Sequence, residues 1–411
     1  MKFDIFCSLC QGGPENKLPN ERKVFENFFN QAKLADELGF ENLWLAESHL
    51  SSEVQKENKN PVIPHFKGEV GLNNDLLQIA HNIFSITKNI NVGSAIKNIL
   101  CNGGPLAHAE ALRYFLYLKD LSPNKDRKIN LGFASGRFEY SNKPYGISPR
   151  NEFEKEFWKI IKGKVILEAS QIFLKGLKGD TFSSAEIPSI KIKSDDFSDE
   201  ESWQQALNLY QKSNNKSICS DEIEIQKWWE FEKLKVIPNE TSLASLDLYI
   251  GSHSEEAQKV ANSILPCKVF NLSITSKDFI EKTHIRMQTL YSQKNRIWQR
   301  EFMPRTVMVF INGDKSLSLK EQRARAKAHG MKALTSYWQA IDGTLDLEKI
   351  SKNINNTLCG SPQDIIEQLQ ERFHPKDRIM LWFDFNCHDN DVVCDSMKTF
   401  YKDVIPFLKK T

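Results

Sequence analysis

The sequence lacks a strong charge imbalance and a long apolar run, and each absence excludes a class of protein. Its 411 residues contain 55 Lys and Arg against 53 Asp and Glu, which leaves a formal net charge of +2. This balance gives no electrostatic basis for binding nucleic acid or a membrane surface. No apolar run reaches the roughly 20 residues that span a bilayer, and the amino terminus has no features of a signal peptide. We therefore expect a soluble, cytoplasmic protein without a nucleic-acid or membrane partner.

Cysteine is also scarce. The eight cysteines are scattered through a long chain, which favours reduced thiols over a disulfide scaffold. Cys7 and Cys10 match the C-x-x-C pattern, but no second pair follows at zinc-ligand spacing. His388 stands between Cys387 and Cys394, a combination that is more often chance than a metal site. We expect no metal site.

Apolar strands and amphipathic helices alternate along nearly the whole chain. Eight strands, each followed by a helix, predict a (β/α)₈ TIM barrel. A doubly wound open sheet is the alternative, but no G-x-G-x-x-G follows the first strand. We expect one domain over residues 1–411, with an insertion at 188–241 before the fifth strand. We expect Trp228 and Trp229 to pack this insertion against the barrel, with a lid over the site as the alternative. The predicted strands are 2–9, 43–46, 90–96, 128–134, 246–250, 268–274, 306–311 and 378–383.

Polar side chains follow three of these strands. They are Glu47, Ser48 and His49 after the second strand, Ser135, Gly136 and Arg137 after the fourth, and Gly251, Ser252, His253 and Ser254 after the fifth. Because the carboxyl ends of barrel strands form the active-site rim, we expect the three clusters to lie on one face.

Each cluster allows a functional and a structural interpretation. Free backbone N–H groups and small hydroxyls at 251–254 suit a phosphate, although Ser254 also suits a simple helix cap. Arg137 neutralises an anion or is a surface cation. His49 suits proton transfer or hydrogen bonding, but a rim histidine without a role is as common. Glu47 binds a ligand or pairs with a cation of a neighbouring strand.

At these residues the chain resembles the flavin-dependent luciferase-like monooxygenases, and particularly the catalytic chain of bacterial luciferase. The similarity extends from the first residues to the last and is poor at 188–241. The segments that carry it are MKFDIF, GFENLWLAESHL, INVGSAI, INLGFASGR, CGSPQDIIEQLQ and SMKTFYKDVIPFLKK.

The resemblance implies a barrel that binds FMN at the carboxyl ends of its strands. The enzyme would take reduced FMN from a separate flavin reductase and use O₂ to oxygenate a small organic substrate, as a homodimer or heterodimer. By position, Glu47 lies beside the flavin, and Ala95 and Ile96 flank a non-proline cis peptide under its ring. Ser252, together with Gly251, His253, Ser254 and local backbone amides, holds the phosphate.

The chain also departs from the luciferase pattern. Luciferase-type sequences read Glu-His-His where this one has Glu47-Ser48-His49, and the first histidine is the one linked to catalysis. Ser135 replaces an arginine that reaches the flavin phosphate, and Arg137 is a candidate substitute. We therefore do not expect light emission, and we take His49 and Ser48 as the catalytic candidates. Two alternatives stay open: a deazaflavin-dependent hydride-transfer oxidoreductase and a non-catalytic flavin-binding relative.

Overall fold

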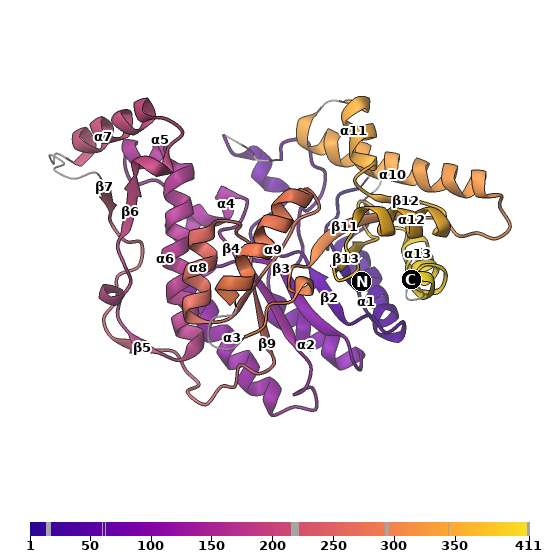
Figure 1. Cartoon of the computed structure of the whole chain (residues 1–411), viewed down its shortest axis with the longest axis horizontal. Coiled ribbons are helices and arrows are strands. Elements are labelled where there is room, and N and C mark those ends of the chain that lie inside the picture. Colours follow the sequence, from indigo (N-terminus) through magenta and orange to yellow (C-terminus); the bar gives the residue numbers. More distant parts are fainter. Residues whose placement is uncertain are drawn as a thin grey trace.

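The computed structural model describes residues 1–13, 18–59, 61, 63–214, 222–291, 296–343 and 345–408. Its centre is a curled nine-stranded sheet in which every strand pair is parallel, surrounded by helices (Figure 1). In their order across the sheet, the strands are β10 (Cys267–Val269), β9 (Leu246–Ile250), β4 (Ile129–Ala134), β3 (Asn91–Asn98), β2 (Asn42–Leu45), β1 (Lys2–Cys7), β13 (Arg378–Trp382), β11 (Arg305–Ile311) and β12 (Leu358–Gly360).

The strands form because short apolar runs are buried by helices on one face and by one another on the other face. All four residues of β2 are buried, for example. One further bridge, between Asn271 and Arg305, links the end of β10 to the start of β11. A sheet of this kind is consistent with a TIM-barrel-like fold, as the alternation of strands and helices predicted.

One strand prediction needs correction, and one strand was missed. The strand predicted at 268–274 ends at Val269, because Leu272 and Ile274 are apolar but 52% and 83% exposed and do not join the core. The sequence pattern also missed β12, whose three residues pair with β11 at the edge of the sheet. A strand this short has no readable period.

Helices follow the strands and cover the sheet. Local signals set their ends: Asn20 caps α1 by accepting a hydrogen bond from the Lys23 amide, and Gly39 follows that helix with φ of 81°. No helix in the described ranges is both long and apolar enough to cross a membrane. The longer helices are α1 (Glu21–Glu37), α2 (Leu76–Ile86), α3 (Gly104–Asp120), α6 (Trp158–Lys178), α8 (Glu255–Ile264), α9 (Lys277–Tyr291), α10 (Leu319–Asp342), α12 (Pro362–Arg372) and α13 (Asn390–Asp403). The shorter ones are α4 (Glu139–Asn142), α5 (Glu152–Glu156), α11 (Leu347–Ile354) and α14 (Ile405–Leu408).

The described residues of the segment 188–241 lie beside α6, on the side away from the central sheet (Figure 1). The backbone amides of Trp228 and Trp229 donate hydrogen bonds to the carboxylate of Glu168 on α6. The Trp228 ring also packs against Trp158, with centroids 5.9 Å apart. The prediction that the two tryptophans pack this segment against the main body is therefore confirmed. Together with the residues just before it, the segment contains β5 (Thr181–Phe182), β6 (Ile190–Lys193), α7 (Glu200–Asn214), β7 (Glu222–Ile225) and β8 (Leu234–Lys235).

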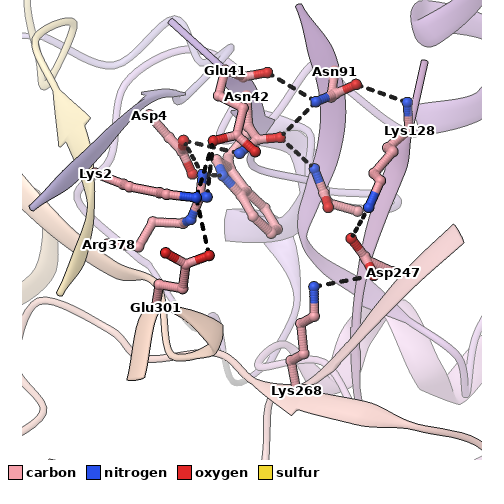
Figure 2. Close-up of polar contacts among 12 residues, drawn as sticks. Lys2, Asp4, Glu41, Asn42, Asn91, Lys128, Asp247, Lys268, Glu301 and Arg378 are labelled. Carbon is pink, nitrogen blue, oxygen red and sulfur yellow. Dashed lines mark hydrogen bonds and ion pairs between the residues drawn. The ribbon is translucent and has the colours of Figure 1, made fainter. Parts of the chain in front are cut away.

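A polar network fills the end of the sheet at which the strands begin (Figure 2). Asp4 is fully buried, and its carboxylate accepts hydrogen bonds from Arg378 at 2.7 Å, Trp44 at 2.8 Å and Asn42 at 2.9 Å. Burial raises the pKa of the Asp4 carboxyl, although the charge of Arg378 opposes this. Asn130 extends the network by donating to Asn42. The network occupies the amino-terminal end of the strands, so a ligand site is left for the opposite end.

Candidate functional site

A cavity of about 540 Å³ lies at the carboxyl ends of β1, β2, β3, β4, β9 and β13. Parallel strands end on the same side of a sheet, so side chains that are distant in sequence meet there. All three of the predicted polar clusters contribute to the cavity wall. From these clusters the wall contains Glu47, Ser48, His49, Ser135, Gly136, Arg137 and Gly251.

Glu47 is the most constrained of these residues. Its side chain is fully buried, and its Oε1 lies 2.7 Å from Lys97 Nζ and 3.0 Å from His49 Nε2. The Ser94 hydroxyl donates to Oε2 at 3.3 Å. Burial would raise the pKa of Glu47, but the charge of Lys97 and the bonds from His49 and Lys97 outweigh burial and lower it to about 2. Glu47 is therefore ionised at neutral pH, and His49 Nε2 is the donor of their hydrogen bond.

This geometry answers one question that the sequence left open. Glu47 pairs with a cation of the neighbouring strand, since Lys97 lies on β3. Sequence reasoning missed Lys97, because the strand was predicted to end at Ile96, whereas β3 continues to Asn98 after a shift in register between Ser94 and Lys97. The useful signal is a lysine at the carboxyl end of the strand beside a buried glutamate.

The peptide bond between Ala95 and Ile96 is cis, as the family resemblance implied. Both residues line the cavity, and so do Ser48 and Arg137. The Arg137 guanidinium lies 5.7 Å from the centroid of the Phe138 ring, which is also part of the wall. Arg137 is thus placed at the cavity rather than on a remote surface.

A second cavity, of about 360 Å³, adjoins the first, and the two share Ala134, Ser135 and Gly251. A Cβ at Gly251 would lie 2.5 Å from Ile96 Cδ1, so a larger residue at this junction would make the Ile96 side chain shift. Ser252 and Ser254 line the second cavity.

Ser254 caps α8, because its hydroxyl accepts a hydrogen bond from the Ala257 amide at 3.4 Å, so the capping interpretation is confirmed. The Ser252 hydroxyl accepts from the Ser254 amide at 3.3 Å. His253 lines neither cavity. Its ring packs edge-on against Phe279 of α9, with centroids 4.9 Å apart.

A second polar group near the site, Asp384, also escaped sequence reasoning. The backbone amide of Ser8, a residue of the main cavity wall, donates to the buried Asp384 carboxylate at 2.9 Å. Its hydroxyl accepts from Trp382 Nε1 at 2.8 Å. Burial, which outweighs the bond from Ser8, raises the pKa of Asp384 to about 6. The ionised form that dominates at neutral pH is therefore a cost to stability.

Asp384→Asn should stabilise the protein above pH 6 by on the order of 1 kcal/mol, because it removes a buried charge and keeps an oxygen for the Ser8 amide. The gain should shrink as the pH falls from about 6 towards 4, where the folded wild-type protein takes up the proton itself. Melting temperatures at pH 7.5 and pH 4.5 measure both effects. Asp126→Asn, at an exposed aspartate, is the control, and an equal gain at both pH values would contradict the prediction.

Comparisons with known proteins define the class of this fold. Neither a protein-family model nor a curated protein sequence matches the chain. Among solved structures, the monooxygenase RslO1 from Streptomyces bottropensis matches with a TM-score of 0.65 at 14% identity, covering 99% of both chains. The oxygenating constituent of 3,6-diketocamphane monooxygenase from Pseudomonas putida, in complex with FMN, matches at 0.58 and 13%, covering 99% of this chain and 98% of that one. An F420-dependent secondary alcohol dehydrogenase matches at 0.54 and 12%, with the same coverage.

The chain therefore has the fold of the luciferase-like monooxygenases and related flavin- or F420-dependent oxidoreductases. The resemblance seen in the sequence is confirmed at the level of the fold. Identities of this size carry no assignment of substrate.

Proposed function

We propose that the protein is a luciferase-like monooxygenase that uses reduced FMN and O₂ to oxygenate a small organic substrate. The observation that carries this proposal is the pair of cavities that meet at Ala134, Ser135 and Gly251. The first is largely apolar with a few convergent polar groups, which suits a flavin ring and an organic substrate. The second has hydroxyls and the amino end of α8, which suit a phosphate.

The residues present fit FMN on the chemistry of their donors. In the second cavity, Ser252 and Ser254 offer hydroxyls, and Lys159 and Lys164 offer positive charge. In the first, Glu47 and Ala95 would lie beside the ring, with Ser135 and Arg137 towards the phosphate. His253 was predicted to contact the phosphate together with its neighbours. Because its ring packs against Phe279, we propose that only its backbone amide contacts the phosphate.

We also propose how the fold supports this site. The bridge between Asn271 and Arg305 would close the eight strands other than β12 into a (β/α)₈ barrel. The whole chain would form one domain, with 188–241 as an insertion before the fifth barrel strand. No G-x-G-x-x-G follows β1, which supports the supply of reduced FMN by a separate flavin reductase.

Bound FMN would supply the activation of O₂, and the chain's own residues would position the reactants and exclude water. Glu47 fixes the His49 ring through Nε2. His49 would then hydrogen-bond the substrate or oxygen in the transition state. The Ser48 hydroxyl can donate a hydrogen bond there, but it cannot carry a proton near neutral pH.

Ser252→Asp should weaken FMN binding at least about tenfold, because it places a carboxylate where the phosphate is proposed to bind. Riboflavin is the matched ligand, since it lacks the phosphate, and its affinity should change little. Titration calorimetry with both ligands measures the difference. Unchanged FMN affinity would contradict the phosphate site.

A deazaflavin-dependent oxidoreductase is the second candidate, and the match to an F420-dependent alcohol dehydrogenase favours it. The absorbance spectrum and mass of any cofactor that copurifies with the protein would separate the two. O₂ uptake that needs both reduced FMN and an organic substrate would support the monooxygenase. Reduction of F420 without O₂ uptake would support the alternative.

A further inference from the structure

The second cavity contains an ion cluster that the proposed function does not explain. Lys164 Nζ, on α6, lies 2.9 Å from the Asp196 carboxylate and 3.1 Å from the Glu256 carboxylate. All three residues line the cavity, beside Ser252 and Ser254. Asp196 belongs to the segment 188–241, whereas Glu256 lies in the first turn of α8.

The second cavity is lined by charges of both signs. Its charged lining consists of two lysines, Lys159 and Lys164, and two carboxylates, Asp196 and Glu256. Burial lowers the pKa of Lys164, but its bonds to the two carboxylates outweigh burial and raise it, so Lys164 stays protonated. An incoming phosphate therefore meets a cation that already donates to two anions, with one of its three N–H donors left over.

Asp196 is held in place by its own segment. Its Oδ2 accepts a hydrogen bond from the Lys193 amide at 3.0 Å. The next residue, Phe197, packs against Phe157 at the start of α6 and against Trp203, with centroids 5.4 Å apart in both pairs. The carboxylate is thus positioned at the cavity by packing and not only by its attraction to Lys164.

We propose that Lys164 is a phosphate-binding residue and that Asp196 of the segment 188–241 competes with the phosphate for it. This inference rests on the proposed function. The consequence of this competition is a lower affinity for FMN. A lower affinity favours the release of a flavin that is received from another enzyme and exchanged after each turnover. The segment would then set how long the flavin stays, without touching its ring.

Asp196→Asn should tighten FMN binding about tenfold and leave riboflavin binding unchanged. Asparagine can still accept the hydrogen bond from Lys193, so the segment keeps its conformation. Asp195→Asn is the matched control. Asp195 is exposed, and its substitution removes the same charge one residue away from Asp196. Lys164→Gln should weaken FMN binding, and Asp196→Asn should add nothing in its presence.

Fluorescence titration of each variant with FMN and with riboflavin gives distinct outcomes. Equal FMN affinities for Asp196→Asn and Asp195→Asn would overturn the competition, as would an equal gain for riboflavin. Binding of neither flavin to any variant or to the wild-type protein would overturn the proposed function and this inference with it. Tighter FMN binding in Asp196→Asn alone would support both.

Discussion

Lys97→Met should lower the free energy of unfolding at pH 7 by about 3–5 kcal/mol, because it leaves the Glu47 carboxylate buried without its cation. Lys97 Nζ lies 2.7 Å from the carboxylate of Glu47, whose side chain is fully buried. Removing one partner of a buried ion pair lowers the free energy of unfolding by far more than an exposed ion pair adds to it. Urea unfolding followed by circular dichroism and by tryptophan fluorescence measures the loss.

The pH dependence of this loss identifies its cause. The folded pKa of Glu47 is about 2 and its ordinary value is 4.5, so the stability that Glu47 contributes is present above pH 4.5. It is lost as the pH falls towards 2. The difference between wild-type protein and Lys97→Met should therefore shrink below about pH 4.5.

A double variant, Glu47→Gln with Lys97→Met, should recover most of the lost stability, because no buried charge remains unpaired. Failure of the double variant to recover would mean that Lys97 contributes by packing. A loss of the same size at pH 3 and pH 7 would have the same meaning.

His49→Ala should reduce turnover about 10²-fold or more while leaving the fold and most of the FMN affinity intact. The melting temperature should fall only modestly, because Lys97 still pairs with the Glu47 carboxylate. His49 lies on the cavity wall, and its Nε2 donates a hydrogen bond to Glu47 at 3.0 Å. We expect it to stabilise the transition state by a hydrogen bond that the ground state does not need. Product formation with reduced FMN supplied measures the effect, once a substrate that is turned over has been found.

His374→Ala is the matched control, because His374 is exposed and lies just before β13, at the opposite end of the sheet. Ser48→His should leave the melting temperature unchanged, since position 48 faces the cavity. If His49→Ala keeps full turnover, or if it unfolds the protein, the polar end of β2 serves structure alone.

The sequence predicted those parts of the fold that depend on local pattern. β2 is buried throughout and ends before Glu47, so an apolar run followed by polar residues correctly marked both a strand and a site. Ser254 was identified as a cap from residue type and position alone. The convergence of Glu47, Ser135 and Gly251 followed from a general property of parallel strands.

The parts that the sequence did not predict depend on contacts between distant segments. Lys97 is 50 residues from Glu47, and a lysine in an apolar strand carries no sign of its partner. Asp196 belongs to a charge run that is typical of a solvated surface, yet its carboxylate reaches Lys164. The first pair follows from the pairing of β2 with β3, and the second from how the 188–241 segment packs beside α6. Neither arrangement leaves a period in the sequence.

The pairing of β1 with β13 has a consequence for synthesis of the chain. Lys2 is in register with Arg378, and the cavity wall includes Ser8 beside Trp382. A ribosome makes the amino-terminal half first, and early parts of a chain begin to fold as they emerge. One edge of β1 therefore stays unpaired until residues 378–382 have left the exit tunnel. Until then, this edge of the nascent protein would be open to aggregation or chaperone binding.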